Sequence, residues 1–213
     1  MSYVYYILGV FLLVTPAGLI VQGRYSNVTL RDLVGRSRNR LGWLHWVNLF
    51  DFARGLGGLL LVKQAFRVID PGAGGNVVTL ATVAAAAVAG LVLQQLFYAA
   101  DDDDMVAPVA YAVGLIFAFL PVKVAALALP LGMVAALGVH SVGLGFVLAA
   151  VAAAAFGYVL RVSPLSLATA CALLCAPVVL AGVLQRRLVI SVRSGPLTKP
   201  APLREVQLSQ GGR

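Results

Sequence analysis

The chain has 213 residues, of which 61% are hydrophobic and only 11% are charged. Its mean hydropathy is +0.93, whereas a soluble domain carries about 25% charged residues. So few charges exclude a water-soluble globular protein. Between Asp104 and Arg186 the only formally charged residues are Lys123 and Arg161. The sequence therefore predicts a single domain that is shielded from water by lipid or by protein.

The basic excess, a net charge of +8, does not indicate a nucleic-acid partner, because the basic residues flank apolar segments and are not spread over a soluble face. We read them as signals of membrane topology. Cys171 and Cys175 lie one helical turn apart in an apolar segment, which is neither a disulfide framework nor a metal-ligand set. We expect no metal and no cofactor.

Seven apolar segments are long enough to be considered as membrane spans. A hydrocarbon core of about 30 Å needs about 20 apolar residues in a helix. The first segment has no basic residue before it and lacks a small-x-small cleavage site, so we expect it to remain as a span. The fourth is the shortest. The seven predicted spans are residues 3–21, 44–62, 77–99, 106–120, 122–139, 142–160 and 165–184.

This pattern predicts an all-α fold, a polytopic transmembrane helix bundle, for residues 1–193, followed by a flexible basic tail, residues 194–213. The tail is rich in Pro, Gly, Ser and Gln, which is typical of disorder. Its basic residues predict attraction to anionic lipids at the membrane surface.

Orientation follows from the Lys and Arg residues. Eleven of the 16 lie in the loop of residues 22–42 or near the C-terminus. This bias predicts that both segments lie on the cytoplasmic side of a bacterial inner membrane. Six predicted spans separate them, so the N-terminus is expected outside. Arg67, Lys123 and Arg161 fall on the opposite side. The eleven are Arg24, Arg31, Arg36, Arg38, Arg40, Arg186, Arg187, Arg193, Lys199, Arg204 and Arg213.

Asp51 and Arg54 are charges inside the second predicted span, where charges are costly and usually face a bundle interior, water or each other. His45 and Asn48 continue this polar strip toward the cytoplasmic end. Two interpretations stay open. The four residues form an interhelical polar clamp, or they line a substrate or ion site.

A run of four carboxylates, Asp101, Asp102, Asp103 and Asp104, lies between the third and fourth predicted spans. The last of them are expected to cap the positive N-terminal end of the next helix. Alternatively, the run pairs with the arginines of the first cytoplasmic loop or holds a divalent cation.

Three stretches resemble the opening of the acyl-phosphate-dependent glycerol-3-phosphate acyltransferases. They are Thr15-Pro16-Ala17-Gly18, the loop from Leu30 to Asn39, and Asp51-Phe52-Ala53-Arg54-Gly55. Those enzymes have seven spans, an outside N-terminus, a glycine-rich Ser-Gly-Asn loop and an Asp-x-x-Lys-Gly pattern. The resemblance implies a cytoplasmic phosphate pocket that uses Arg54 together with Arg31, Arg36, Ser37, Arg38 and Asn39.

The chain also departs from that family. Arg36 and Arg38 stand where the family has glycines, and larger side chains there block close backbone approach to a phosphate. Asp101 to Asp104 replace the second, lysine- and glycine-rich phosphate loop. The resemblance therefore implies an acyl transfer activity that is lost or changed.

Three functional hypotheses follow. The first is a non-catalytic membrane component, bound to another membrane protein or to copies of itself, because alanine-rich segments allow helices to pack closely in lipid. The second is a small-solute or ion transporter or channel, which requires Asn48, Asp51, Arg54, Gln94 and Gln95 to converge. The third is an acyltransferase-like lipid enzyme. We assign no catalytic residue and do not expect an enzyme.

Overall fold

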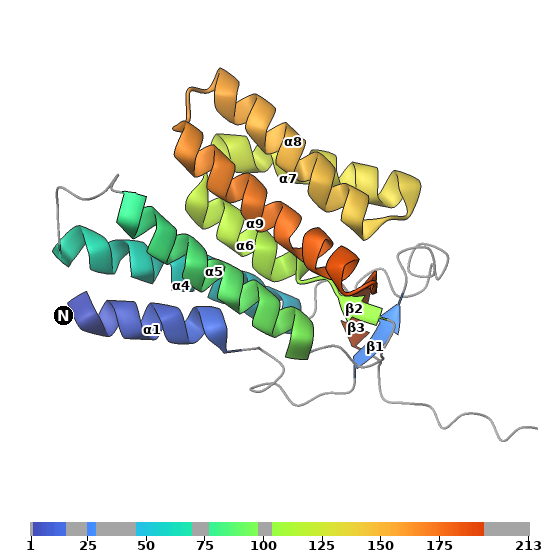
Figure 1. Cartoon of the computed structure of the whole chain (residues 1–213), viewed down its shortest axis with the longest axis horizontal. Helices are drawn as coiled ribbons and strands as arrows, with labels where there is room; N and C mark the ends of the chain where they lie inside the picture. The colour runs from blue at the N-terminus through green and yellow to red at the C-terminus, as the bar shows by residue number, and fades with distance from the viewer. Residues whose placement is uncertain (1, 16–24, 29–45, 70–76, 98–103, 194–213) are drawn as a thin grey trace, which may run out of the picture.

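The computed structural model describes residues 2–15, 25–28, 46–69, 77–97 and 104–193. These residues form seven α-helices and three short strands (Figure 1). In chain order they are α1 Ser2–Val14, β1 Tyr25–Val28, α4 Trp46–Ile69, α5 Val77–Phe97, β2 Asp104–Val106, α6 Val109–Phe119, α7 Val122–Val139, α8 Val142–Val159, α9 Pro164–Val183 and β3 Arg187–Arg193. Each predicted span overlaps one of the helices, and the mostly helical fold is confirmed.

Three helices in the described part of the chain, α7, α8 and α9, are long and apolar enough to cross a membrane. Many of their large apolar side chains face outward. On α7, Leu131 is 49% and Val134 is 65% exposed. Large apolar patches of this kind mark surfaces that lipid or another protein covers. Apolar side chains of this chain therefore face outward as well as into the core of the bundle.

The short helix α6 lies inside the bundle. It has 11 residues, which gives a length of about 17 Å at about 1.5 Å per residue. Pro121 ends it, because the residue before a proline is disfavoured in helical conformation, and Leu120 is accordingly extended. Most of its side chains are buried, including Tyr111, Leu115 and Ile116. The helix that looked short in the sequence is thus enclosed by its neighbours.

Glycines set the close approach of α4 to α6. A Cβ atom added at Gly114 of α6 would lie 2.3 Å from the backbone oxygen of Phe52 on α4. One added at Gly55 of α4 would lie 2.5 Å from the backbone oxygen of Tyr111 on α6. No side chain fits at these distances, so glycine at both positions lets the two backbones touch. Small residues commonly provide such contacts between membrane helices.

The helices form two groups that are joined by α6 and by the packing of α5 against α9. In Figure 1, α1, α4 and α5 lie together, and α7, α8 and α9 form the second group. The principal packing pairs are α1 with α4, α4 with α6, α7 with α8, and α8 with α9. α7 packs along α8 and scarcely touches α6.

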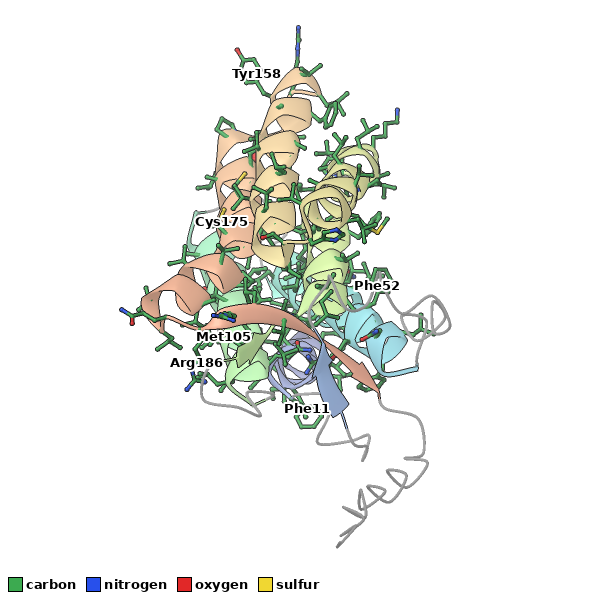
Figure 2. The ribbon with its side chains drawn as sticks, turned by 90° about the vertical axis from the view of Figure 1, so that its right-hand side faces the viewer. Phe11, Phe52, Met105, Tyr158, Cys175 and Arg186 are labelled. Carbon is green, nitrogen blue, oxygen red and sulfur yellow. The ribbon has the colours of Figure 1, made fainter. Side chains whose placement is uncertain are left out.

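A three-stranded sheet caps one end of the bundle, with strand order β1-β3-β2. β1 is antiparallel to β3, with Tyr25 opposite Arg193. β2 is parallel to β3, with Asp104 opposite Arg187. Figure 2 shows Met105 in this sheet, Arg186 next to the sheet, and Tyr158 at the opposite end of the bundle.

The sheet corrects the all-α prediction. Its strands contain 4, 3 and 7 residues, which is too short for a period of two to stand out from an apolar background. They are stable only because segments far apart in the sequence meet. The sheet joins the first loop, the third loop and the start of the C-terminal segment, which the basic-residue pattern had predicted to share one side.

Candidate functional site

A buried ion pair lies on the inner face of α4. The side chains of Asp51 and Arg54 are 8% and 1% exposed, and Arg54 Nη2 lies 3.1 Å from Asp51 Oδ1. Residues three apart on a helix are neighbours on one face, so both side chains point the same way. The pair neutralises two charges that would be costly to bury singly.

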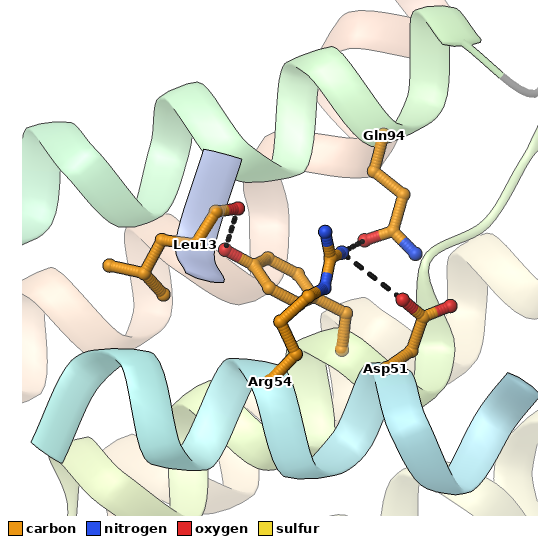
Figure 3. A network of polar contacts seen from close by, with 5 residues as sticks. Leu13, Asp51, Arg54 and Gln94 are labelled. Atoms are coloured by element: carbon orange, nitrogen blue, oxygen red, sulfur yellow. Dashed lines mark hydrogen bonds and ion pairs between the residues drawn. The ribbon is translucent and has the colours of Figure 1, made fainter. Parts of the chain in front are cut away.

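Two further helices complete a group that we call the polar cluster, consisting of Asp51, Arg54, Gln94 and Tyr111. Figure 3 shows Asp51, Arg54 and Gln94 pointing toward one another. Arg54 Nη2 donates a hydrogen bond of 2.9 Å to Gln94 Oε1 on α5. The guanidinium lies over the Tyr111 ring on α6, 4.7 Å from its centroid. A cation over an aromatic face is attracted to the ring quadrupole. Arg54 of α4 thus binds a side chain of α5 and a side chain of α6.

The Tyr111 hydroxyl connects the polar cluster to α1. It donates a hydrogen bond of 2.9 Å to the backbone oxygen of Leu13. Leu13 is in the last turn of α1, where carbonyl groups lack partners within the helix. This hydrogen bond satisfies the Leu13 carbonyl and ties the end of α1 to α6.

The polar cluster retains hydrogen-bonding capacity. Within the described structure, Arg54 Nε and Nη1 are buried and have no acceptor. Asp51 Oδ1 is close enough to Arg54 for an ion pair but not aligned for a hydrogen bond. Buried donors without partners are rare because each is costly. Two donors of the Arg54 guanidinium thus remain unpaired in the described part of the chain.

The two neighbouring glutamines serve different helices. Gln94 meets Arg54, whereas Gln95 Nε2 donates a hydrogen bond of 3.3 Å to the backbone oxygen of Pro177 on α9. Adjacent residues on a helix point about 100° apart. The structure brings Gln94 to Asp51 and Arg54 and directs Gln95 elsewhere. Asn48 is half-buried on α4, one turn before Asp51.

Two residues whose side chains bind carbonyl groups of other helices were not predicted from the sequence. Tyr111 lies in the fourth predicted span and was not singled out. Lys63 fell beyond the predicted second span, yet α4 continues past it, and Lys63 Nζ donates a hydrogen bond of 2.8 Å to the backbone oxygen of Ala118. Its ammonium also lies 5.6 Å from the Phe119 ring centroid. Lys63 thereby satisfies a carbonyl in the last turn of α6, where a cation is favourable.

Several predicted site residues lie outside the described residues. These are His45, Arg31, Arg36, Ser37, Arg38, Asn39, Asp101, Asp102 and Asp103. Asp104 is described and does not cap α6, because it begins β2 and the helix starts after Pro108 with no side-chain cap. The prediction that this residue caps the next helix was wrong. In the described part of the chain no three His, Cys, Asp or Glu residues lie close enough together to hold a metal ion.

Comparison with known proteins assigns no family to the chain. No family model, no curated protein and no solved structure matches it.

Proposed function

We propose that the protein crosses a bacterial inner membrane seven times, with its N-terminus outside and its C-terminus in the cytoplasm, and acts there as a non-catalytic component of a membrane assembly. The observation that carries this proposal is the polar cluster. Its two charges neutralise each other and bind α4, α5 and α6 together, as a structural clamp does.

The sheet supports the orientation. It holds together β1 after the first span, β2 after the third and β3 after the seventh. Segments that follow an odd number of crossings share one side of the membrane. Because the first loop and the C-terminal segment also carry eleven of the 16 Lys and Arg residues, that side is the cytoplasm.

The outer surface supports an assembly role. Apolar side chains stand out from α7 and α8, as at Val134, Val151 and Val159, which are 65%, 59% and 74% exposed. Another membrane helix can pack on such a face by van der Waals contact in lipid. Homo-oligomers and complexes with a different membrane protein are both compatible with this surface.

Native mass spectrometry of the tagged protein, extracted gently from its own membrane, tests the proposal. The extract is first mixed with membranes from cells grown on heavy isotopes. A partner bound in the cell then carries light isotopes only, whereas a contaminant acquired after lysis carries both. We expect a stoichiometric protein partner or a second copy of the chain. A protein that is monomeric at every detergent concentration tested would refute the assembly role.

A second function, transport of a small solute or ion, is favoured by one observation. Arg54 Nε and Nη1 have no acceptor in the described structure, and a guanidinium with two unpaired donors can bind a small anion or polar solute. In proteoliposomes, Asp51→Asn should then change the flux of a small anion, whereas Lys123→Gln on the exposed start of α7 should not. Equal flux in the wild type, in Asp51→Asn and in protein-free vesicles would remove this function.

A further inference from the structure

An apolar pocket of about 410 Å³ lies between α6, α7 and α8. We call it the apolar pocket, and every side chain that lines it is apolar. Val113 and Phe117 of α6, Ala126 and Met133 of α7, Phe146 of α8 and Ile190 of β3 are among its walls. The pocket exists because α7 packs along α8 and scarcely touches α6, so the two helices joined at Pro121 diverge.

The apolar pocket runs along the membrane-spanning direction of α7. Its lining on that helix extends from Ala126 to Leu137, or about 17 Å at about 1.5 Å per residue. That length is roughly half of a hydrocarbon core of about 30 Å. Ala126, Pro130 and Met133 line the pocket and are also exposed, so it opens sideways at the depth of the lipid tails.

The contents of such a pocket follow from its chemistry. Water needs polar partners and is not retained in an apolar cavity. Hydrocarbon gains free energy in proportion to the apolar area that it covers. At about 30 Å³ for a water-sized group, the volume of about 410 Å³ accommodates about 14 methylene-sized groups. This matches one acyl chain.

The end of the apolar pocket near the start of α8 has polar neighbours. Val142 and Ile190 line this end, and Val142 is the first residue of α8. The first N–H groups of a helix lack internal acceptors and carry partial positive charge. Ser141 Oγ accepts the N–H of Leu144, which leaves the N–H groups of Val142 and Gly143 for a ligand. His140, exposed beside them, adds a side-chain hydrogen-bond donor. Donor groups thus lie where an apolar tail would end.

We propose that the apolar pocket binds one acyl chain of an anionic phospholipid, with the phosphate at His140 and the N-terminus of α8. This inference rests on the membrane placement in the proposed function but not on the presence of a protein partner. It adds a specific lipid site to the outer surface of the bundle.

A phospholipid with a photoreactive diazirine near the end of one acyl chain tests the site. Phosphatidylglycerol carrying the diazirine is incorporated into proteoliposomes of the full-length chain, and the labelled peptides are mapped after irradiation. The matched variants are Ala126→Phe, which places a ring in the pocket, and Ala155→Phe, at an exposed position of α8 away from it. Excluding even two methylene groups weakens binding by about tenfold.

We expect labelling of α6, α7 and α8 at the pocket, competition by unlabelled phosphatidylglycerol, and a loss of about tenfold in Ala126→Phe but not in Ala155→Phe. Competition by phosphatidylcholine should be weaker, and His140→Ala should reduce that preference. If free palmitate competes as well as phosphatidylglycerol, the phosphate contact is refuted. Equal labelling of both phenylalanine variants, or labelling spread evenly over all outward helix faces, would overturn the site.

Membrane placement is measured in the same samples. If the chain floats with the vesicles and resists carbonate extraction while pocket labelling is absent, the site fails and the proposed function stands. If the chain does not remain with the vesicles, the membrane placement itself fails. A second protein chain cross-linked at the pocket in native membranes would identify a protein occupant and would also overturn the lipid assignment.

Discussion

The Asp51–Arg54 pair is a buried clamp whose removal should be costly only when one charge is left behind. The test is a double-mutant cycle with Asp51→Leu, Arg54→Met and the two together. Each replacement is apolar and roughly similar in length to the residue that it removes. Because the cycle uses the same side chains throughout, the difference between the singles and the double isolates the interaction of the pair.

The structure sets the magnitude. The Arg54 side chain is 1% exposed, and without Asp51 its remaining contacts are Gln94 Oε1 at 2.9 Å and the Tyr111 ring. Leaving one buried charge without its partner costs about 3–5 kcal/mol. The double variant leaves no charge. It leaves Gln94 Oε1 buried without the donor that Arg54 supplied, which costs about 1 kcal/mol. The double is therefore expected to be more stable than either single variant.

Free energies of unfolding can be measured by titrating SDS into mild-detergent micelles and following circular dichroism. Lys123→Met, which removes an exposed charge from the start of α7, is the control and should change stability by less than about 0.5 kcal/mol. If the double variant loses as much as the two singles added together, the residues do not interact. If Asp51→Leu alone costs less than about 1 kcal/mol, Arg54 is reached by water and the clamp is refuted.

Three further predictions concern packing, topology and chemistry. Gly114→Ala should destabilise the bundle by about 1–3 kcal/mol, because the new Cβ would lie 2.3 Å from a backbone oxygen. Gly57→Ala, which meets nothing within 4 Å, should stabilise it by about 0.5–1 kcal/mol, and the reverse order in SDS titrations would contradict the packing. In intact cells that lack the native cysteines, a membrane-impermeant thiol reagent should label Ser163→Cys and not His140→Cys, and the opposite pattern would invert the topology. The purified protein should transfer no acyl groups from acyl phosphate to glycerol 3-phosphate above a protein-free control, whereas turnover that Arg54→Met abolishes would establish an enzyme.

The helices were readable from the sequence because lipid imposes a simple rule. A backbone that has no water to bond with must satisfy its own polar groups, so runs of apolar residues bounded by Pro, Gly and charge become helices. The residues of α7, from Val122 to Val139, were predicted to the residue. Asp51 and Arg54 also stood out, because two charges in an otherwise apolar segment demand partners.

The partners themselves were decided by tertiary structure. Nothing local distinguishes Gln94, which reaches Arg54, from Gln95, which reaches Pro177, since the choice depends on which helix lies on each side of α5. The roles of Tyr111 and Lys63 depend on the carbonyl groups of α1 and α6 to which they donate hydrogen bonds. The sheet likewise required β1, β2 and β3 to converge from distant positions in the chain. The sequence by itself determined which segments avoid water, because that depends on each segment's own composition, whereas the contacts among them depend on packing geometry that no single segment contains.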